Sequence, residues 1–295
     1  MSESPKRSVL VTGAARVTHS RLQFAAQGFR VFATARSLKT LSNLAEKGIE
    51  TLTLDVTQPE SIAALKSEIV SRTGGSLDIL FNNAGALYEA PAIEADPARV
   101  RSLFNTNVFG LMEMVTAFTP LLLALVPSGH EPTIINVASV LARLPSPFTS
   151  AYNATKAAVA AYSDTLRLEV HPLGIRVVTL YMGEVSTPLM TTDNINFGSE
   201  SIYRDAEAAV KQRTVTHLEK TMAPEQFARE VVGEIVDGKR SFLWKGSNAF
   251  TVWLLNAVGP RTVFDSAMVK AAGLDNKQTK ASVFKLGQST AGKMA

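Results

Sequence analysis

The sequence predicts an α/β fold, with a doubly wound parallel sheet of about seven strands and helices on both faces. Short apolar runs alternate with longer amphipathic segments along most of the 295 residues, a pattern typical of βαβ units. The runs have few polar interruptions, which indicates strands that are buried on both faces. The runs expected to form strands are 8–12, 30–34, 51–56, 77–81, 133–137, 175–180 and 241–244.

One continuous domain is expected over residues 8–245, because no repeat or linker interrupts the alternation. Strand signals stop within it at 187–223, which we expect to form a lobe that selects the substrate. An apolar helical segment, 246–272, follows this domain. The basic tail 273–295 and the polar residues 1–7 are expected to be disordered.

The composition argues against several classes of site. Without cysteine, the chain has no disulfide and no thiol nucleophile. Its histidines, His19, His130, His171 and His217, lack the spacing of a metal site, so none is expected. The net charge of +4 equals that of the five lysines and one aspartate from residue 270 onward, so the body is neutral. We therefore expect no nucleic-acid partner.

A cytoplasmic location is expected. The first residues lack a secretory signal, and no stretch approaches the roughly 20 apolar residues of a membrane span. The segment 246–272 admits three roles: core packing, a lid over an apolar substrate, or peripheral contact with a membrane surface.

Tyr152 and Lys156 stand four residues apart in a helical segment, so their side chains share one face. An ammonium group near a phenol favours the phenolate and lowers its pKa from about 10. The tyrosine then becomes a usable proton donor and acceptor. Ser139 follows the run 133–137 and can hydrogen-bond a substrate carbonyl oxygen. Asn107, before a long helical segment, is by itself a helix cap or kink residue.

Together these residues resemble a known family, the short-chain dehydrogenases/reductases, over about residues 8–245. The resemblance implies a Rossmann-type fold and hydride transfer with a nicotinamide cofactor. The matching motifs, in the family's order, are Thr12-Gly13, Asp55-Val56, Asn82-Asn83-Ala84-Gly85, Asn107, Ser139, and Tyr152 with Lys156.

The resemblance also implies a role for each of these residues. Tyr152 would protonate a carbonyl oxygen, or deprotonate an alcohol in the reverse reaction, and Ser139 would orient the carbonyl. Lys156 would lower the tyrosine pKa and hydrogen-bond the nicotinamide ribose, while Asn107 would hold a water of the proton relay. Residues expected to contact the cofactor are Gly13, Asp55, Val56, Asn83, Ala84, Gly85, Tyr152, Lys156, Val185 and Thr187.

The residue after the second expected strand predicts NADP(H) as the cofactor. In this fold an acidic residue there selects NAD, whereas a basic residue accepts the 2′-phosphate of NADP. The segment 33–36 has no acid and ends in Arg36, which can clamp a phosphate or simply begin a helix at the surface. Arg16, in the first turn, is a second candidate for that phosphate.

Residues 24–36 narrow the resemblance to the fungal 1-acyl-dihydroxyacetone-phosphate-reductase-like branch. Members of that branch carry an apolar C-terminal segment, and many act on lipidic or polycyclic carbonyls, including in secondary metabolism. The expected reaction is therefore NADPH-dependent reduction of a carbonyl on an apolar small molecule or lipid, or the reverse oxidation.

The phosphate-binding turn departs from the family pattern Thr-Gly-x-x-x-Gly-x-Gly. Of its three glycines only Gly13 is present, because Val17 and His19 stand at the other two positions. The spacing to Gly28 also indicates a turn shortened by two or three residues. Three explanations stay open: a remodelled turn that binds NADPH, a redox-inactive protein that binds or isomerises a ligand without nicotinamide, or a gene-model error at this junction.

The substrate and the direction of reaction are not encoded in a readable motif. Met182 stands where the family usually has a proline before Gly183. The alanine-rich segment 154–161 permits close helix packing, as in a homodimer or homotetramer. Side chains that either line the substrate site or form core are Met182, Met190, Phe197, Tyr203 and Met222.

Overall fold

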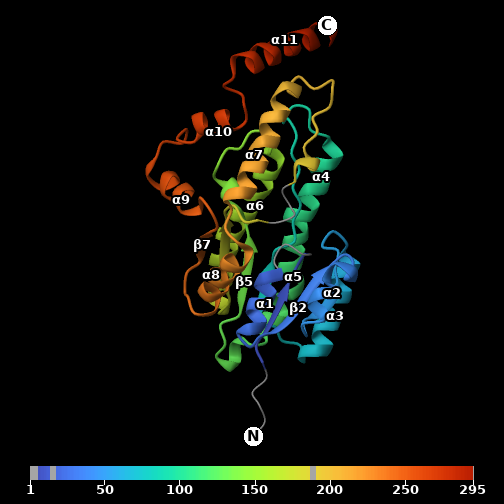
Figure 1. Ribbon diagram of the computed structural model, residues 1–295. Helices are drawn as coiled ribbons and strands as arrows, with labels where there is room; N and C mark the ends of the chain where they lie inside the picture. The colour runs from blue at the N-terminus through green and yellow to red at the C-terminus, as the bar shows by residue number, and fades with distance from the viewer. Residues whose placement is uncertain (1–5, 14–17, 187–190, 295) are drawn as a thin grey trace.

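A seven-stranded parallel sheet forms the centre of the computed structural model, which describes residues 6–13, 18–186 and 191–294 (Figure 1). Every apolar run expected to form a strand does so, and the α/β prediction is confirmed. The strands are β1 (Ser8–Val11), β2 (Arg30–Ala35), β3 (Glu50–Thr53), β4 (Ile79–Asn82), β5 (Thr133–Val137), β6 (Arg176–Met182) and β7 (Phe242–Lys245).

The strand order is β3-β2-β1-β4-β5-β6-β7, and all neighbouring pairs are parallel. The chain therefore winds outward in two directions from the β1–β4 pair, in which Val11 lies beside Phe81. In such sheets ligands bind beyond the carboxyl ends of the strands, at the point where the order reverses. The fold thus places a ligand site beside the segments that follow β1 and β4.

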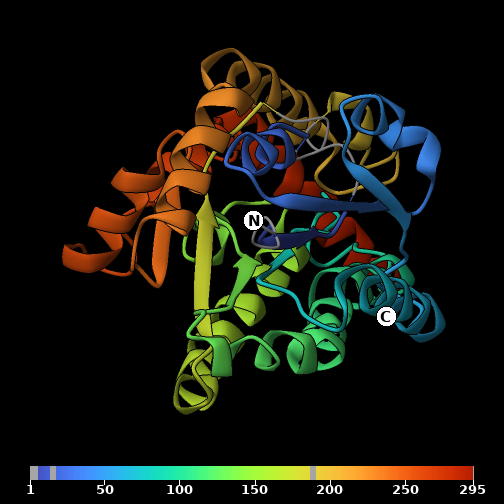
Figure 2. The ribbon, with the colours of Figure 1, turned by 90° about the horizontal axis from the view of Figure 1, so that it is seen from below.

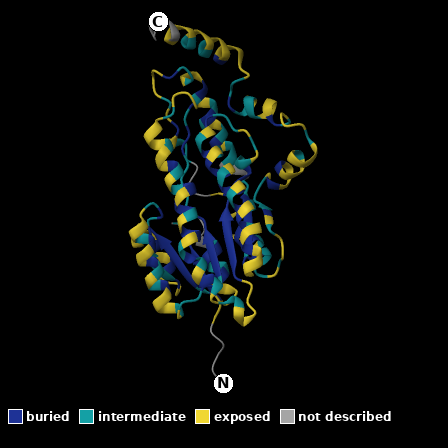
Figure 3. Cartoon of the chain, turned by 180° about the vertical axis from the view of Figure 1, so that it is seen from behind, coloured by how far each residue is buried: buried dark blue, intermediate teal, exposed yellow. Residues whose placement is uncertain are grey.

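Helices cover both faces of the sheet (Figure 2). The face covered by α1, α2 and α8 buries one apolar cluster, and the face covered by α3, α5 and α6 buries the other. The strands between them are buried, as Figure 3 shows in dark blue. These helices are α1 (Thr18–Ala26), α2 (Ser42–Ala45), α3 (Pro59–Thr73), α5 (Gly110–Leu123), α6 (Ser150–Val170) and α8 (Pro224–Val236).

The expected lobe, 187–223, is free of β-strands in its described part and contains the helix α7 (Glu207–Lys220). Phe197 and Tyr203 pack on Phe148, with ring centroids 4.8 and 5.5 Å away. These two aromatic residues therefore form a small core for the lobe. The lobe leaves and rejoins the domain at adjacent points, because Val185 bridges Met222.

Three helices follow β7: α9 (Ala249–Val258), which packs beside β7, α10 (Asp265–Ala271) and α11 (Lys277–Met294). Of these, α11 lies at the opposite end of the molecule from the N-terminus (Figure 1). The expectation of a disordered tail from residue 273 differs from the structure, in which α11 occupies most of it. Asn276 caps this helix, since its side-chain oxygen accepts hydrogen bonds from the backbone of Gln278 and Thr279. The helix lacks proline and is rich in good helix formers, which accounts for its formation.

One helical stretch among the described residues, Pro97–Ser128, is long and apolar enough to cross a membrane by length and composition. It contains α4 (Pro97–Phe104), a π-helical turn (Asn105–Phe109) and α5. Met114, Phe118 and Leu122 of α5 are fully buried in the cluster beneath the sheet. Their burial identifies α5 as a core helix of the domain.

Candidate active site

A cleft of about 180 Å³ opens at the carboxyl ends of β1 to β4, where the strand order reverses. Most of the residues that the sequence predicts for the cofactor lie together here. Arg16 and Thr187 fall outside the described residues, and Val185 is buried in a neighbouring cavity. The predicted residues that line the cleft are Gly13, Arg36, Asp55, Val56, Asn83, Ala84 and Gly85.

The turns after β1 and β4 are locked together. The hydroxyl of Thr12 accepts hydrogen bonds from the backbone N–H groups of Asn83 and Ala84, both at 3.0 Å. The Asn83 amide donates to the Thr12 carbonyl oxygen at 3.1 Å. Gly13 has a φ of +88°, and a Cβ atom there would lie 2.8 Å from the Ala84 Cα. This close approach requires glycine and explains the pairing of the two motifs.

At the far end of the cleft lie the long cationic side chain of Arg36 and the fixed carboxylate of Asp55. Arg36 directly follows β2, is exposed, and forms no ion pair with another described residue. Asp55 is held in place because its Oδ1 accepts from the backbone and the hydroxyl of Thr57, at 2.9 and 2.7 Å. Val56 packs closely against Gly110. A Cβ atom added at Gly110 would lie 2.6 Å from the Val56 carbonyl oxygen.

Arg21 on α1 is a buried cation that sequence reasoning did not single out. Its side chain is fully buried, and Nη2 donates to the carbonyl oxygens of Gly13 and Thr34. Its Nε and Nη1 have no hydrogen-bond partner in the described chain. Burial lowers the pKa of Arg21 to about 10, so the group stays charged at neutral pH. A positive charge therefore lies directly against Gly13.

His19, which stands at a glycine position of the family turn, lies on α1. Its Nδ1 is 3.3 Å from the Glu225 carboxylate on α8, so this side chain faces the neighbouring helix. Val17, at the other glycine position, falls outside the described residues.

Tyr152 and Ser139 line a second cavity, over the carboxyl ends of β5 and β6. Tyr152 lies in the first turn of α6 and is 5% exposed. The Lys156 ammonium is 5.8 Å from the centroid of its ring and donates to the Val137 carbonyl oxygen at 2.7 Å. Ser139 Oγ accepts from the Leu141 N–H at 3.1 Å. The structure thus brings together the phenol, ammonium and hydroxyl groups predicted for proton transfer.

Asn107 lies in the π-helical turn between α4 and α5, inside a helical stretch and not at a helix cap. Its Oδ1 accepts from the Ala86 N–H at 2.7 Å, and its Nδ2 donates to the Ala86 carbonyl oxygen and to the Thr155 hydroxyl, both at 3.0 Å. Thr155 in turn donates to the Tyr152 carbonyl oxygen at 2.7 Å. Asn107 therefore joins the cleft to α6.

The cavity beside Tyr152 has a volume of about 130 Å³ and a largely apolar lining. Four ionisable side chains interrupt that lining: Glu89 after β4, Glu184 after β6, and Arg213 and His217 on α7. Sequence reasoning missed all four. The available signal was the spacing of Arg213 and His217, which puts both on one face of a helix.

Glu89 and Arg213 form a buried ion pair. Arg213 Nη2 lies 2.8 Å from Glu89 Oε1, and their side chains are 9% and 2% exposed respectively. Burial raises the pKa of Glu89, and the Arg213 charge opposes that rise. Burial likewise lowers the pKa of Arg213, and Glu89 opposes the fall. The attraction of close, opposite charges in this dry environment supports the ionised pair.

His217 contacts Glu184, with 3.1 Å between Nε2 and Oε1. Burial, and to a lesser degree the Arg213 charge, lowers the pKa of His217 below its usual 6.5. The lowered pKa favours the neutral imidazole, which can donate an Nε2–H to the Glu184 carboxylate. Its Nδ1 is then a buried acceptor that has no partner among the described residues.

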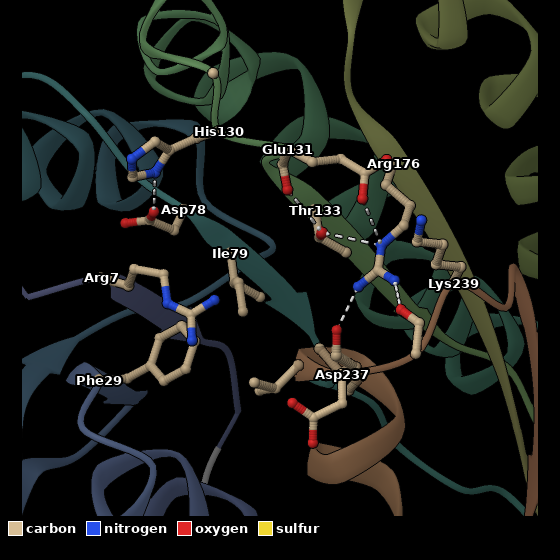
Figure 4. A pocket seen from close by; sticks show the side chains of 14 residues that line it. Arg7, Phe29, Asp78, Ile79, His130, Glu131, Thr133, Arg176, Asp237 and Lys239 are labelled. Atoms are coloured by element: carbon tan, nitrogen blue, oxygen red, sulfur yellow. Dashed lines mark hydrogen bonds and ion pairs between the residues drawn. The ribbon is translucent and has the colours of Figure 1, made fainter.

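A larger cavity, of about 380 Å³, lies at the opposite edge of the sheet, at the amino ends of β1, β4, β5 and β6 (Figure 4). Its polar side chains largely bond to one another. His130 Nδ1 is 3.1 Å from Asp78, and Arg176 Nε donates to the Thr133 hydroxyl at 3.2 Å. This cavity lies away from the predicted catalytic residues, all of which follow the carboxyl ends of the strands.

Comparison with known proteins agrees with this geometry. A family model described as short chain dehydrogenase matches residues 7–196. The short-chain dehydrogenase anuB of Penicillium roqueforti is 36% identical over 249 residues, which cover 84% of each chain. An NADPH-dependent 1-acyldihydroxyacetone phosphate reductase of Schizosaccharomyces pombe is 37% identical over 220 residues, 73% of this chain and 72% of that protein.

Solved structures share the fold. A short-chain dehydrogenase from Streptomyces avermitilis superposes with a TM-score of 0.72 at 26% identity, covering 91% of this chain and 100% of that one. A Burkholderia cenocepacia short chain dehydrogenase in complex with NADP gives a TM-score of 0.69 at 24% identity. Sheet topology, motif positions and these similarities agree, and the chain belongs to the short-chain dehydrogenase/reductase family, oxidoreductases that act on CH–OH and C=O groups.

Proposed function

We propose that this protein uses NADPH to reduce a carbonyl group of an apolar small molecule or lipid, and that it catalyses the reverse oxidation when the substrates are exchanged. The observation that carries this proposal is the cavity that Ser139 and Tyr152 line together, with Lys156 one helical turn behind Tyr152. When bound, the cofactor supplies the hydride. The proton and the orientation of the substrate come from the residues of the chain.

In this mechanism the Ser139 hydroxyl donates a hydrogen bond to the substrate carbonyl oxygen. Tyr152 gives its phenolic proton to the same oxygen as the alcohol forms. The Lys156 ammonium stabilises the phenolate that remains, because an opposite charge nearby favours the ionised form. Asn107 positions α6 through Thr155 and, as the family resemblance implies, would hold a water that returns the proton.

Two cations support NADP as the cofactor. Arg36 is exposed at the cleft and can bind the 2′-phosphate, for which a planar guanidinium is well suited. Arg21 places a buried positive charge behind Gly13, where it favours the negative diphosphate. This charge would compensate in part for the glycines that the turn lacks. A relative that is NADPH-dependent, the Schizosaccharomyces pombe reductase, supports the same cofactor.

The second candidate function is ligand binding or isomerisation without nicotinamide, which the loss of two turn glycines favours. Calorimetric titration with NADPH separates the two functions. Micromolar binding is expected for the reductase, and millimolar or weaker binding would support the alternative.

Replacement of Tyr152 by phenylalanine tests the mechanism. Tyr152→Phe is expected to lower kcat by about 10²–10⁴-fold, the usual contribution of a positioned proton donor, while NADPH still binds. Equal kcat values for this variant and the parent would exclude Tyr152 as the proton donor.

The last apolar helix supports a proposal about location. Phe250, Trp253, Leu254 and Val258 are exposed on α9, a surface suited to peripheral contact of a cytoplasmic protein with a membrane. Co-sedimentation with liposomes, with and without the residues after Ser247, tests this contact, and equal sedimentation would remove it. Self-association as a homodimer or homotetramer, proposed from the alanine-rich part of α6, is testable by analytical ultracentrifugation.

A further inference from the structure

Two side chains that line the same cavity as Ser139 and Tyr152 each carry a buried acceptor without a partner among the described residues. These acceptors are Oε2 of Glu89 and Nδ1 of His217. A buried polar atom costs free energy unless it is paired, and native proteins pair nearly all such atoms. A molecule that enters the cavity can supply the missing donors.

The chemistry of these atoms specifies a donor. The other oxygen of Glu89 is bonded to Arg213, and the other nitrogen of His217 lies 3.1 Å from Glu184. Each side chain is thereby held in place, and each keeps one acceptor atom for a further hydrogen bond. A hydroxyl group can donate to such an acceptor, whereas an ether or a hydrocarbon cannot.

The charges around the cavity disfavour an anionic substrate group. Two carboxyl groups, Glu89 and Glu184, stand against the one guanidinium of Arg213, and Arg213 is already paired. A phosphate or carboxylate would meet like charge here and would find no free cation among the described lining residues. Phosphate esters are therefore poorly matched to the lining of this cavity.

The rest of the lining requires an apolar body for the substrate. Around the catalytic residues the cavity is walled mainly by aliphatic side chains, against which hydrocarbon is buried favourably. They are Leu87, Val140, Leu141, Leu144, Val185 and Met268.

We infer that the substrate is an uncharged, apolar carbonyl compound with a hydroxyl group remote from the reacting carbonyl, which donates its hydrogen bond to Glu89 or His217. This inference rests on the proposed reductase function and adds the substrate class. Glu89 and His217 would then act as selectivity residues, distinct from the proton-transfer residues Tyr152 and Ser139 that line the same cavity.

Straight-chain aldehydes of increasing length, ending in hydroxyl, methoxy, methyl or phosphate, test the inference. The methoxy compound keeps the oxygen of the hydroxyl and lacks only its proton. With NADPH, kcat/KM at the best length is expected to be at least about tenfold higher for the hydroxyl compound than for the methoxy compound, as loss of one buried hydrogen bond implies. The phosphate compound is expected to be the poorest substrate.

Variants at the acceptors show whether these residues cause the preference. His217→Phe and Glu89→Gln are each expected to reduce the ratio of hydroxyl to methoxy kcat/KM, and the double variant to bring it close to one. His217→Asn, which keeps an acceptor oxygen near the position of Nδ1, is expected to retain more of the ratio than His217→Phe. His130→Phe, at the opposite edge of the sheet, is the matched control and is expected to leave the ratio unchanged.

Equal kcat/KM for hydroxyl and methoxy compounds at every length, or a preference for phosphate, would overturn the inference and leave the reductase function standing. An undiminished preference in the folded double variant would overturn the role of Glu89 and His217. If no aldehyde is reduced, the proposed function fails instead. Calorimetric titration of the same compounds then decides: tighter binding of the hydroxyl compound supports the inference, and equal binding overturns it.

Discussion

Gly13 links the two turns of the cofactor cleft, and its replacement by alanine should destabilise the whole domain. The added Cβ would lie 2.8 Å from the Ala84 Cα and 3.1 Å from the Ala84 nitrogen, in a residue whose φ is +88°. Ala84 cannot move away freely, because its N–H is bonded to the Thr12 hydroxyl at 3.0 Å. The obstacle is backbone, so a change of side-chain rotamer does not relieve it.

The expected magnitude has two parts. A positive φ costs an alanine about 1–2 kcal/mol relative to glycine. Overpacking against a rigid neighbour adds about 1–3 kcal/mol. Gly13→Ala should therefore lower the free energy of unfolding by about 2–5 kcal/mol, a large part of the roughly 5–15 kcal/mol of an ordinary domain.

Gly28→Ala is the matched control for this measurement. Gly28 has a similar φ of +82°, but a Cβ there would meet no atom within 4 Å. Its replacement should cost only the backbone part, about 1–2 kcal/mol. Urea denaturation of both variants without cofactor isolates the steric part as the difference between them. Equal losses of stability would refute the claim that contact between the two turns requires glycine at position 13.

Three further predictions concern the charged side chains of the two cavities. Arg36→Ser should weaken NADPH binding about 10–100-fold and change NADH binding little, because it removes a charge-assisted hydrogen bond worth about 1.5–3 kcal/mol. Calorimetric titrations with both cofactors check this prediction. A parallel loss of NADH affinity would contradict it. Glu89→Gln and Arg213→Met each break the buried Glu89–Arg213 pair and should each lower the free energy of unfolding by about 3–5 kcal/mol. The double variant should lose less than the sum of these two values. Additive losses in urea denaturation would show that the two side chains are not coupled. Because burial lowers the pKa of His217 in the folded protein, the unfolded chain binds the proton more readily, so stability present above pH 6.5 is lost as pH falls below it. His217→Gln should reduce this loss between neutral and acidic pH, as measured by urea midpoints, and an unchanged pH dependence would show that His217 does not cause it.

The strands and the helix that carries Tyr152 and Lys156 could be predicted because their signals are local. Each buried strand is one uninterrupted apolar run, and Tyr152 and Lys156 are neighbours on one helix. The same reasoning did not find Glu89 and Arg213, which are 124 positions apart and meet only after the lobe has packed over the sheet. Nothing in the residues around Glu89 alone distinguishes a buried carboxylate from a solvated one.

Two other differences have separate physical causes. The tail was expected to be disordered because it is charged and lies at the end of the sequence. In the structure, the Asn276 cap and residues with high helix propensity support α11 instead. Arg21 was not singled out because arginine on a short helix is ordinarily exposed, and only the structure shows it turned inward beneath Gly13. The sequence predicted the positions of the Asn107 and Ser139 segments, while the contacts of their side chains depend on tertiary packing.

The position of the α7 residues that line the cavity has a consequence for how this protein could evolve. Ser139, Tyr152 and Lys156 lie inside residues 7–196, the part that matches the family model, whereas Arg213 and His217 come later in the chain. Part of the proposed selectivity apparatus is thus encoded in a second stretch of the gene, after the one that carries the proposed proton-transfer residues together with Glu89. Mutation in the second stretch can redirect the enzyme toward new compounds while the inherited chemistry stays intact.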